Sequence, residues 1–228
     1  MRRILPCLKP GDSRGAPAMS AALDKDDGIV GCWSCHGPVA GRALFCHTCG
    51  AVQPPRQLDH FARLGLDRQF DVDAAELERR YFGFQRNLHP DRFAQKSARE
   101  RAIAESQSAS LNQAYETLND PLSRAAYLLE IAGIRSAATN AATVDDEELL
   151  SEAMENREAL MEAETLGAVD ALTAKAMAAA LGCLAELSDA FRRNELGTAN
   201  RLATRMRYWR KLGEEAQGKR RRLEGIET

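Results

Sequence analysis

Apolar side chains recur every three or four residues along most of the chain beyond residue 57, which is the spacing of amphipathic helices. The clearest stripe falls at i, i+4, i+7 and i+11 and consists of Leu77, Tyr81, Phe84 and Leu88. Asp73 is a suitable N-cap for this helix, and Glu76 follows three residues later, as in a capping box. The pattern predicts helices over about 58–64, 73–88, 98–118, 121–133, 145–166, 168–195 and 198–217.

Proline, glycine and small polar residues divide these helices into groups. Pro90 ends the second helix because it forces the preceding residue out of helical geometry, and Pro121 opens the fourth. Gly167 and Gly197 are the expected breaks between the last three helices, which predict a bundle. The fold class expected is all-α, with a helical hairpin, then a three-helix bundle, and a small zinc-ribbon-like module at the N-terminus. The expected division is a disordered leader over 1–30, a cysteine-rich module over 31–52, helical domains over 57–133 and 144–217, and a frayed tail over 218–228 that holds the basic run Lys219–Arg222.

Charge is balanced overall but divided along the chain. The net charge is −2 over 228 residues, which argues against nucleic acid or a membrane surface as the partner of the whole chain. Nine acids against one base lie between Asp145 and Glu164, whereas eleven bases against five acids follow from Arg192. This asymmetry indicates either two helices that pair with each other or two separate partner surfaces. No stretch of 18 or more apolar residues predicts a membrane span.

The first residues give a weak indication of location. The apolar run Ile4-Leu5 is too short for a secretory signal, and Pro6, Pro10 and Gly11 interrupt the amphipathic helix that a mitochondrial presequence needs. We therefore expect a bacterial cytoplasmic protein, with the mitochondrial matrix as the alternative.

Four cysteines form a metal-ligand pattern, Cys32-x2-Cys35-x10-Cys46-x2-Cys49. Two Cys-x-x-Cys knuckles supply four thiolates, the complete tetrahedral shell of a structural zinc ion. Gly37 and Gly50 follow the two pairs and are expected to give the backbone its freedom there. A four-Cys site is closed, so it favours scaffolding or docking over catalysis. An iron–sulfur cluster, a redox pair and disulfides are weaker alternatives.

The tripeptide His89-Pro90-Asp91 lies between two predicted helices, the first of them basic. It is followed by Asn112-Gln-Ala-Tyr115, by Pro121-Leu-Ser-Arg-Ala125 and by Tyr127-Leu-Leu129. Together with the segment from Leu149 to Leu160, these motifs resemble the HscB family, the J-domain co-chaperones of iron–sulfur cluster assembly. The resemblance covers about 58–217, and the four-Cys module resembles an extension of some longer members.

The resemblance implies two binding surfaces and no chemistry of the chain's own, so the expected role is ATPase activator of a partner chaperone. His89, Pro90 and Asp91 would trigger ATP hydrolysis in an HscA/DnaK-type chaperone, and Arg80 and Arg86 would face that chaperone's acidic groove. An IscU-type scaffold protein would bind the second domain at Leu150, Met154, Glu155, Glu158, Glu162 and Tyr208. Ser151 departs from the family pattern, in which a bulky apolar residue is common at this position.

The residues themselves agree with these roles. Positive charge on a helix speeds encounter with an acidic partner. Leu150, Met154 and Glu158 follow one another at intervals of four and so share one stripe of a helix. Two alternatives remain, a general J-domain adaptor for another client and a metal-dependent redox protein that uses the cysteine cluster. A nucleic-acid adaptor is disfavoured because residues 31–50 carry one base, Arg42.

Overall fold

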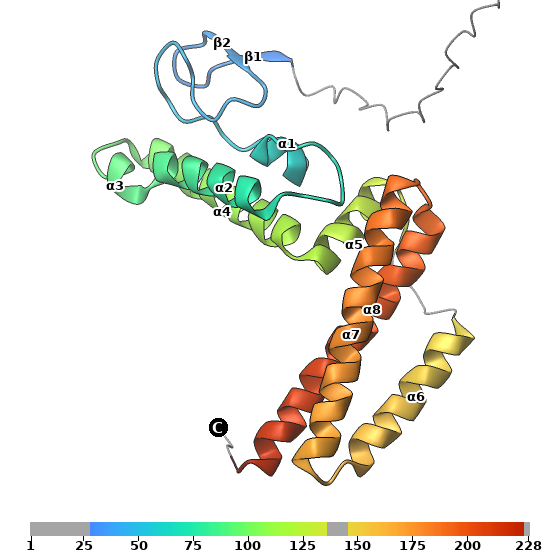
Figure 1. Ribbon diagram of the computed structural model, residues 1–228. Helices are drawn as coiled ribbons and strands as arrows, with labels where there is room; N and C mark the ends of the chain where they lie inside the picture. The colour runs from blue at the N-terminus through green and yellow to red at the C-terminus, as the bar shows by residue number, and fades with distance from the viewer. Residues whose placement is uncertain (1–27, 136–145, 226–228) are drawn as a thin grey trace, which may run out of the picture.

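The computed structural model describes residues 28–135 and 146–225, which fold into eight helices and one two-stranded sheet (Figure 1). The expected all-α fold class, with a small N-terminal module, is confirmed. The expected leader falls almost entirely outside the described residues, as does most of the segment between the two predicted helical domains.

The N-terminal module is built on a short hairpin. Strand β1 (Ile29–Gly31) pairs antiparallel with β2 (Pro38–Ala40), and Phe45 bridges Val52 further along the chain. Its own core is only a few side chains, among them the buried Val39 and Ala51. So small a core stabilises little by itself, which makes the cysteine cluster the main local constraint.

The next part is a helical hairpin with two short helices added. Helices α2 and α4 pack side by side, and α1 lies against α4 (Figure 1). Asp73 is the N-cap of α2, as expected, and accepts from the backbone N–H groups of Ala75 and Glu76. Ser97 and Glu100 form a capping box at the start of α4. The bounds are α1 His60–Leu64, α2 Ala74–Leu88, α3 Pro90–Phe93, α4 Ala98–Asn119 and α5 Pro121–Ile131. Helix α3 was not predicted, because a single turn is too short to show periodicity.

The C-terminal part is a three-helix bundle of uneven packing. Helices α7 and α8 form a tight hairpin, and α6 contacts them much less extensively. The predicted breaks at Gly167 and Gly197 are wrong, since both glycines lie in the first turn of a helix. The chain turns two to four residues earlier, where Thr165 caps one helix and Asn194 adopts a φ of 56°. The bounds are α6 Glu147–Glu162, α7 Leu166–Arg192 and α8 Leu196–Leu223.

The expectation of a frayed tail from residue 218 is also wrong. Helix α8 continues to Leu223, and its last turns have partners on the other two helices of the bundle. Lys219 Nζ donates to the backbone carbonyls of Leu160 and Met161, at 2.6 and 2.8 Å, and Arg220 pairs with Asp170 at 3.2 Å. The partners in these contacts lie fifty to fifty-nine residues apart in sequence, so local pattern did not reveal them.

Helix α7 differs from expectation in composition. It is long and apolar enough to cross a membrane by length and composition alone, although no such stretch was expected. Its buried side chains, such as Val169, Ala176 and Leu187, belong to the core shared with α8. These residues form the face of α7 that packs on α8, and 17% of the apolar window as a whole is buried.

The two helical parts are joined in one continuous core, and the bundle runs across the direction of the α2–α4 hairpin (Figure 1). Helix α5 packs on α8, the rings of Phe70 and Phe191 stack at 5.0 Å, and Arg124 lies over Phe70 at 5.2 Å. Arg210 on α8 donates to Asp120 at 2.6 Å. Apolar stacking and an ion pair therefore fix the angle between the two parts.

Asp120 serves both elements at this junction. One carboxylate oxygen accepts from Ser123 as the N-cap of α5, and the other accepts from Arg210. Burial raises the pKa of Asp120, but the donors of Ser123 and Arg210 outweigh it and lower the pKa overall. A lowered pKa in the folded state means that this stabilisation is present at neutral pH and is lost as the pH falls through the lowered value.

We predict that Phe70→Ala weakens the junction. Phe70 is 4% exposed, and truncating a buried phenylalanine costs about 3–5 kcal/mol in free energy of unfolding. Urea denaturation followed by circular dichroism measures the loss. Phe82→Ala is the matched control, because that ring is 52% exposed and its loss should change stability little. Equal losses in the two variants would contradict the assigned role of Phe70.

Candidate functional site

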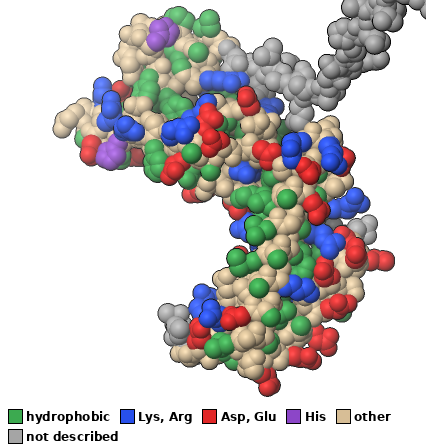
Figure 2. All heavy atoms as spheres, in the orientation of Figure 1, with side chains coloured by type: hydrophobic (Ala, Val, Ile, Leu, Met, Phe, Trp, Pro, Cys, Tyr) green, Lys and Arg blue, Asp and Glu red, His purple; other side chains and the backbone are tan. Residues whose placement is uncertain are grey.

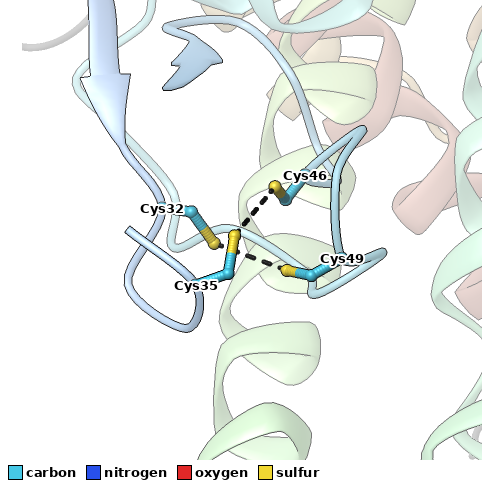
Figure 3. A group of neighbouring side chains, drawn as sticks. All are labelled: Cys32, Cys35, Cys46 and Cys49. Atoms are coloured by element: carbon cyan, nitrogen blue, oxygen red, sulfur yellow. Dashed lines mark hydrogen bonds between the residues drawn. The ribbon is translucent and has the colours of Figure 1, made fainter. Parts of the chain in front are cut away.

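The four cysteines of the N-terminal module converge on one point (Figure 3). Their Sγ atoms all lie within 4.8 Å of one another, and the pairs Cys32–Cys49 and Cys35–Cys46 are 3.7 and 3.8 Å apart. A tetrahedral ion with metal–sulfur bonds of about 2.3 Å has sulfur–sulfur edges of roughly 3.8 Å. These separations are far beyond a disulfide bond of about 2.05 Å. The arrangement fits a single ion rather than a cluster, whose several metal and sulfide atoms hold cysteines further apart.

Each Cys-x-x-Cys pair forms a backbone knuckle. The N–H of His36 donates to the carbonyl of Cys32, and the N–H of Gly50 donates to that of Cys46. Gly50 takes a positive φ of 73°, as expected, but in the first knuckle His36 takes it, at 60°. The role assigned to Gly37 is therefore wrong by one residue.

Hydrogen bonding prepares these thiols unequally for a cation. The backbone N–H of Cys35 is the largest cause that lowers the pKa of Cys32 to about 6, and donors from Ser34 and Gln53 add to it against burial. The backbone N–H of Gly37 lowers the pKa of Cys35, but the neighbouring thiols and burial raise it to about 11. The four thiols cannot all lose their protons at these separations unless a positive ion lies between the sulfur atoms.

The module is also fastened to α4. Gln53 donates to Cys32 Sγ at 3.3 Å, and its backbone carbonyl accepts from the buried Gln107 at 2.8 Å. The guanidinium of Arg99 lies 4.4 Å from the centre of the Trp33 ring. A buried hydrogen-bond chain thus connects one metal-ligand sulfur directly to the second long helix of the hairpin.

The predicted tripeptide lies at the exposed tip of that hairpin. His89 is the N-cap of α3, and its Nδ1 accepts from the backbone N–H of Asp91 at 3.3 Å. The side chains of His89 and Asp91 are 60% and 90% exposed, while Phe93 is buried and anchors the turn. His89, Pro90 and Asp91 are therefore presented to solvent by a fixed turn.

The two arginines predicted beside this tip differ in accessibility. Arg86 is exposed, whereas Arg80 pairs with Glu76 at 2.6 Å and donates to the carbonyls of Leu64 and Gly65 at the end of α1. The guanidinium of Arg80 is thus used to hold α1 against α2. Arg79 and Phe82 are exposed near Arg86 on the outer face of α2. They were not predicted as site residues, although the spacing 79, 82, 86 places all three on one face of a helix.

The second predicted surface lies on α6. Leu150 and Met154 are 47% and 74% exposed, and the buried positions of the helix are instead Leu149, Asn156 and Leu160. Acidic side chains gather over α6, whereas basic ones gather around the tip of the α2–α4 hairpin (Figure 2). The acidic members predicted for this surface are exposed, namely Glu155, Glu158 and Glu162.

Tyr208 is more enclosed than the α6 residues. It is half-buried between the helices, its ring contacts Trp209, and its hydroxyl donates weakly to the backbone carbonyl of Glu152 at 3.5 Å. Burial is the main cause that raises its pKa. The hydrogen bond from Tyr208 to Glu152 attaches α8 to α6.

Sequence models of two families match both helical parts. The HSCB C-terminal oligomerisation domain matches residues 145–217, and the DnaJ domain matches residues 59–127. The human iron–sulfur cluster co-chaperone protein HscB is 36% identical over 193 residues, which are 83% of this chain and 82% of that protein. The crystal structure of human co-chaperone protein HscB has a TM-score of 0.75 at 35% identity and covers 83% of this chain and 98% of that one. Chaperone HscB from Vibrio cholerae has a TM-score of 0.64 at 33% identity, over 73% and 99% of the two chains.

We predict that the purified chain carries about one metal ion and that Cys32→Ser lowers this content, because three thiolates leave the tetrahedral shell open. Metal analysis and protease digestion measure the outcome. Removal of the ion should expose residues 31–50 to protease, since binding of a structural ion supplies on the order of 10–16 kcal/mol to folding. A metal-free chain that stays resistant there would contradict this assignment.

Proposed function

Because this chain belongs to the HscB family of iron–sulfur cluster co-chaperones, we propose that it binds an IscU-type scaffold protein and stimulates ATP hydrolysis by an HscA/DnaK-type chaperone. One observation carries the proposal: a solvent-exposed His89-Pro90-Asp91 tip and an exposed apolar and acidic helix face lie on opposite parts of one continuous structure. The chain acts as an activator of its partner's ATPase rather than as an enzyme.

The chaperone binds the tip of the α2–α4 hairpin. His89, Pro90 and Asp91 make the contact that triggers hydrolysis, and Arg86, with Arg79 beside it, supplies the positive charge that attracts an acidic groove. Arg80 contributes mainly by fixing α1 against α2, since its guanidinium is already bonded within the chain.

The scaffold binds the outer face of α6. Leu150 and Met154 supply exposed apolar contact, and an adaptable methionine suits a binding surface. Glu155, Glu158 and Glu162 flank them, so the partner surface should be apolar with basic groups at its edge. Tyr208 supports α6 from behind through its contact with the backbone of Glu152.

The closed cysteine site holds a structural zinc ion in this proposal. Four thiolates at tetrahedral separations leave no open position for a substrate, which argues against the alternative of a metal-dependent redox protein. The contacts of Gln53 and Arg99 with neighbouring elements support a bracing role for the module along α4.

The division into module, J-domain and scaffold-binding domain at 31–52, 57–133 and 144–217 is kept as part of the proposal.

The human and bacterial relatives fit either the bacterial cytoplasm or the mitochondrial matrix, so the bacterial cytoplasm stays a prediction. The alternative of a J-domain adaptor for another client is disfavoured by the match of residues 145–217 to the C-terminal domain of this family.

We predict that His89→Gln reduces chaperone stimulation to the basal rate, because the exposed imidazole at the tip makes contact with the chaperone. A steady-state ATPase assay with a purified DnaK-type chaperone measures this effect. Scaffold binding by the same variant should be unchanged, since the tip and α6 belong to separate parts of the fold. Full stimulation by the variant would rule out the J-domain role.

We predict that Met154→Lys raises the scaffold Kd by about tenfold or more, as for loss of an interface hot spot. Isothermal titration calorimetry with a purified IscU-type scaffold is the measurement. Met177→Lys is the matched control, because Met177 is also exposed but lies on α7. If both variants bind the scaffold like the unaltered chain, α6 is not the binding face.

A further inference from the structure

The last turn of α6 carries an exposed methionine that the family pattern did not identify. Met161 is 79% exposed, and it follows Leu150 and Met154 at intervals of eleven and seven residues. At 100° per residue these three side chains fall within a sector of about 40°, roughly 100–120° around the helix from the buried Leu149 and Leu160. An apolar line therefore runs along the outer face of α6 to its last turn, with Glu158 and Glu162 beside it.

That last turn is held by a residue from another helix. The final carbonyls of a helix lack partners within the helix itself. Ala163, which follows α6, has an extended backbone, and Lys219 of α8 donates to the carbonyls of Leu160 and Met161 at 2.6 and 2.8 Å. A cation at a helix C-terminus is also favoured by the helix dipole. Lys219 thus stabilises the C-terminus of α6 in two ways, through hydrogen bonds to two carbonyl groups and through its positive charge.

Polar contacts provide much of the remaining attachment of α6. The buried Asn156 accepts from Lys175 of α7 at 2.7 Å, and Glu152 pairs with Arg205 of α8 at 2.7 Å. An open cavity of about 700 Å³ is lined by the first half of α6 together with α7 and α8. Because α6 packs less extensively than α7 and α8, its position depends on individual anchors, and in the last turn these are Lys219 and the buried Leu160.

We infer that the apolar centre of the scaffold-binding surface extends to the last turn of α6, beside the acidic flank at Glu162, with Met161 as a further contact residue and Lys219 as its positioning residue. The inference rests on the proposed function, since the occupant is the same IscU-type scaffold. Continuity with Leu150 and Met154 and the acidic flank of Glu158 and Glu162 favour one partner surface, apolar at its centre and basic at its edge.

The contact role is tested with Met161→Ala. Calorimetric titration with a purified IscU-type scaffold should show a Kd about fivefold weaker, as expected for loss of part of one buried methionine side chain. Met177→Ala on α7 is the matched control and should leave the Kd unchanged, since that methionine is exposed on another helix. An unchanged Kd for Met161→Ala, or an equal loss in both variants, would overturn the contact role.

The positioning role is tested with Lys219→Met. Hydrogen exchange should become faster in the last turn of α6 of the free chain, and the scaffold Kd should weaken. Arg221→Met is the matched control, because Arg221 is an exposed member of the same basic run of α8. Lys219→Arg, which restores a donor, should recover much of the lost affinity; equal effects of the two Met variants would indicate simple charge attraction and overturn the positioning role.

Two readouts separate this inference from the proposed function. If Met161→Ala and Lys219→Met both leave the Kd unchanged, while Met154→Lys still loses binding, Met161 and Lys219 take no part in scaffold binding and the inference fails alone. If the unaltered chain does not bind the scaffold, the proposed function fails and the inference fails with it.

Discussion

The packing of α5 on α8 is the contact on which the rest of the molecule depends. Beside it, Phe70 from the segment before α2 stacks on Phe191 of α7, and within it Asp120 caps α5 while pairing with Arg210 of α8. A stacked pair of rings limits sliding, and an ion pair to a capping residue ties the start of one helix to the middle of another. The tip that carries His89 and the outer face of α6 are consequently parts of one continuous core, and a protein that bridges two partners needs such a fixed connection.

The two binding surfaces are supported by different kinds of contact. The tip is stabilised by local geometry, since Pro90 starts a one-turn helix, His89 caps it and Phe93 anchors it in the core. Helix α6 is held by long-range polar anchors, with Arg205 near its start, Lys175 in its middle and Lys219 at its end. Apolar side chains on its outer face are thereby free to meet a partner.

The cysteine module adds a third kind of constraint. Its own apolar core is too small to fold alone, so four converging sulfurs and a bound ion would provide the missing stability. The chain from Cys32 through Gln53 to Gln107 then passes that local order to α4, the helix against which α2 and the tip are packed.

The sequence by itself determined most of the helices, the cap at Asp73, the helix start at Pro121, the metal pattern and the tripeptide between two helices, because these features depend on residues within a few positions of one another. It also identified the exposed stripe of α6 through Leu150 and Met154. It misplaced the bundle turns at Gly167 and Gly197, missed α3, and treated the helical end at Lys219 as a frayed tail. Only the tertiary structure decided that Arg80 is occupied within the chain and that Lys219 holds the end of α6. In each case the partner lies on another element, fifteen to fifty-nine residues away, and a side chain's neighbours across such a separation are set by packing and not by local pattern.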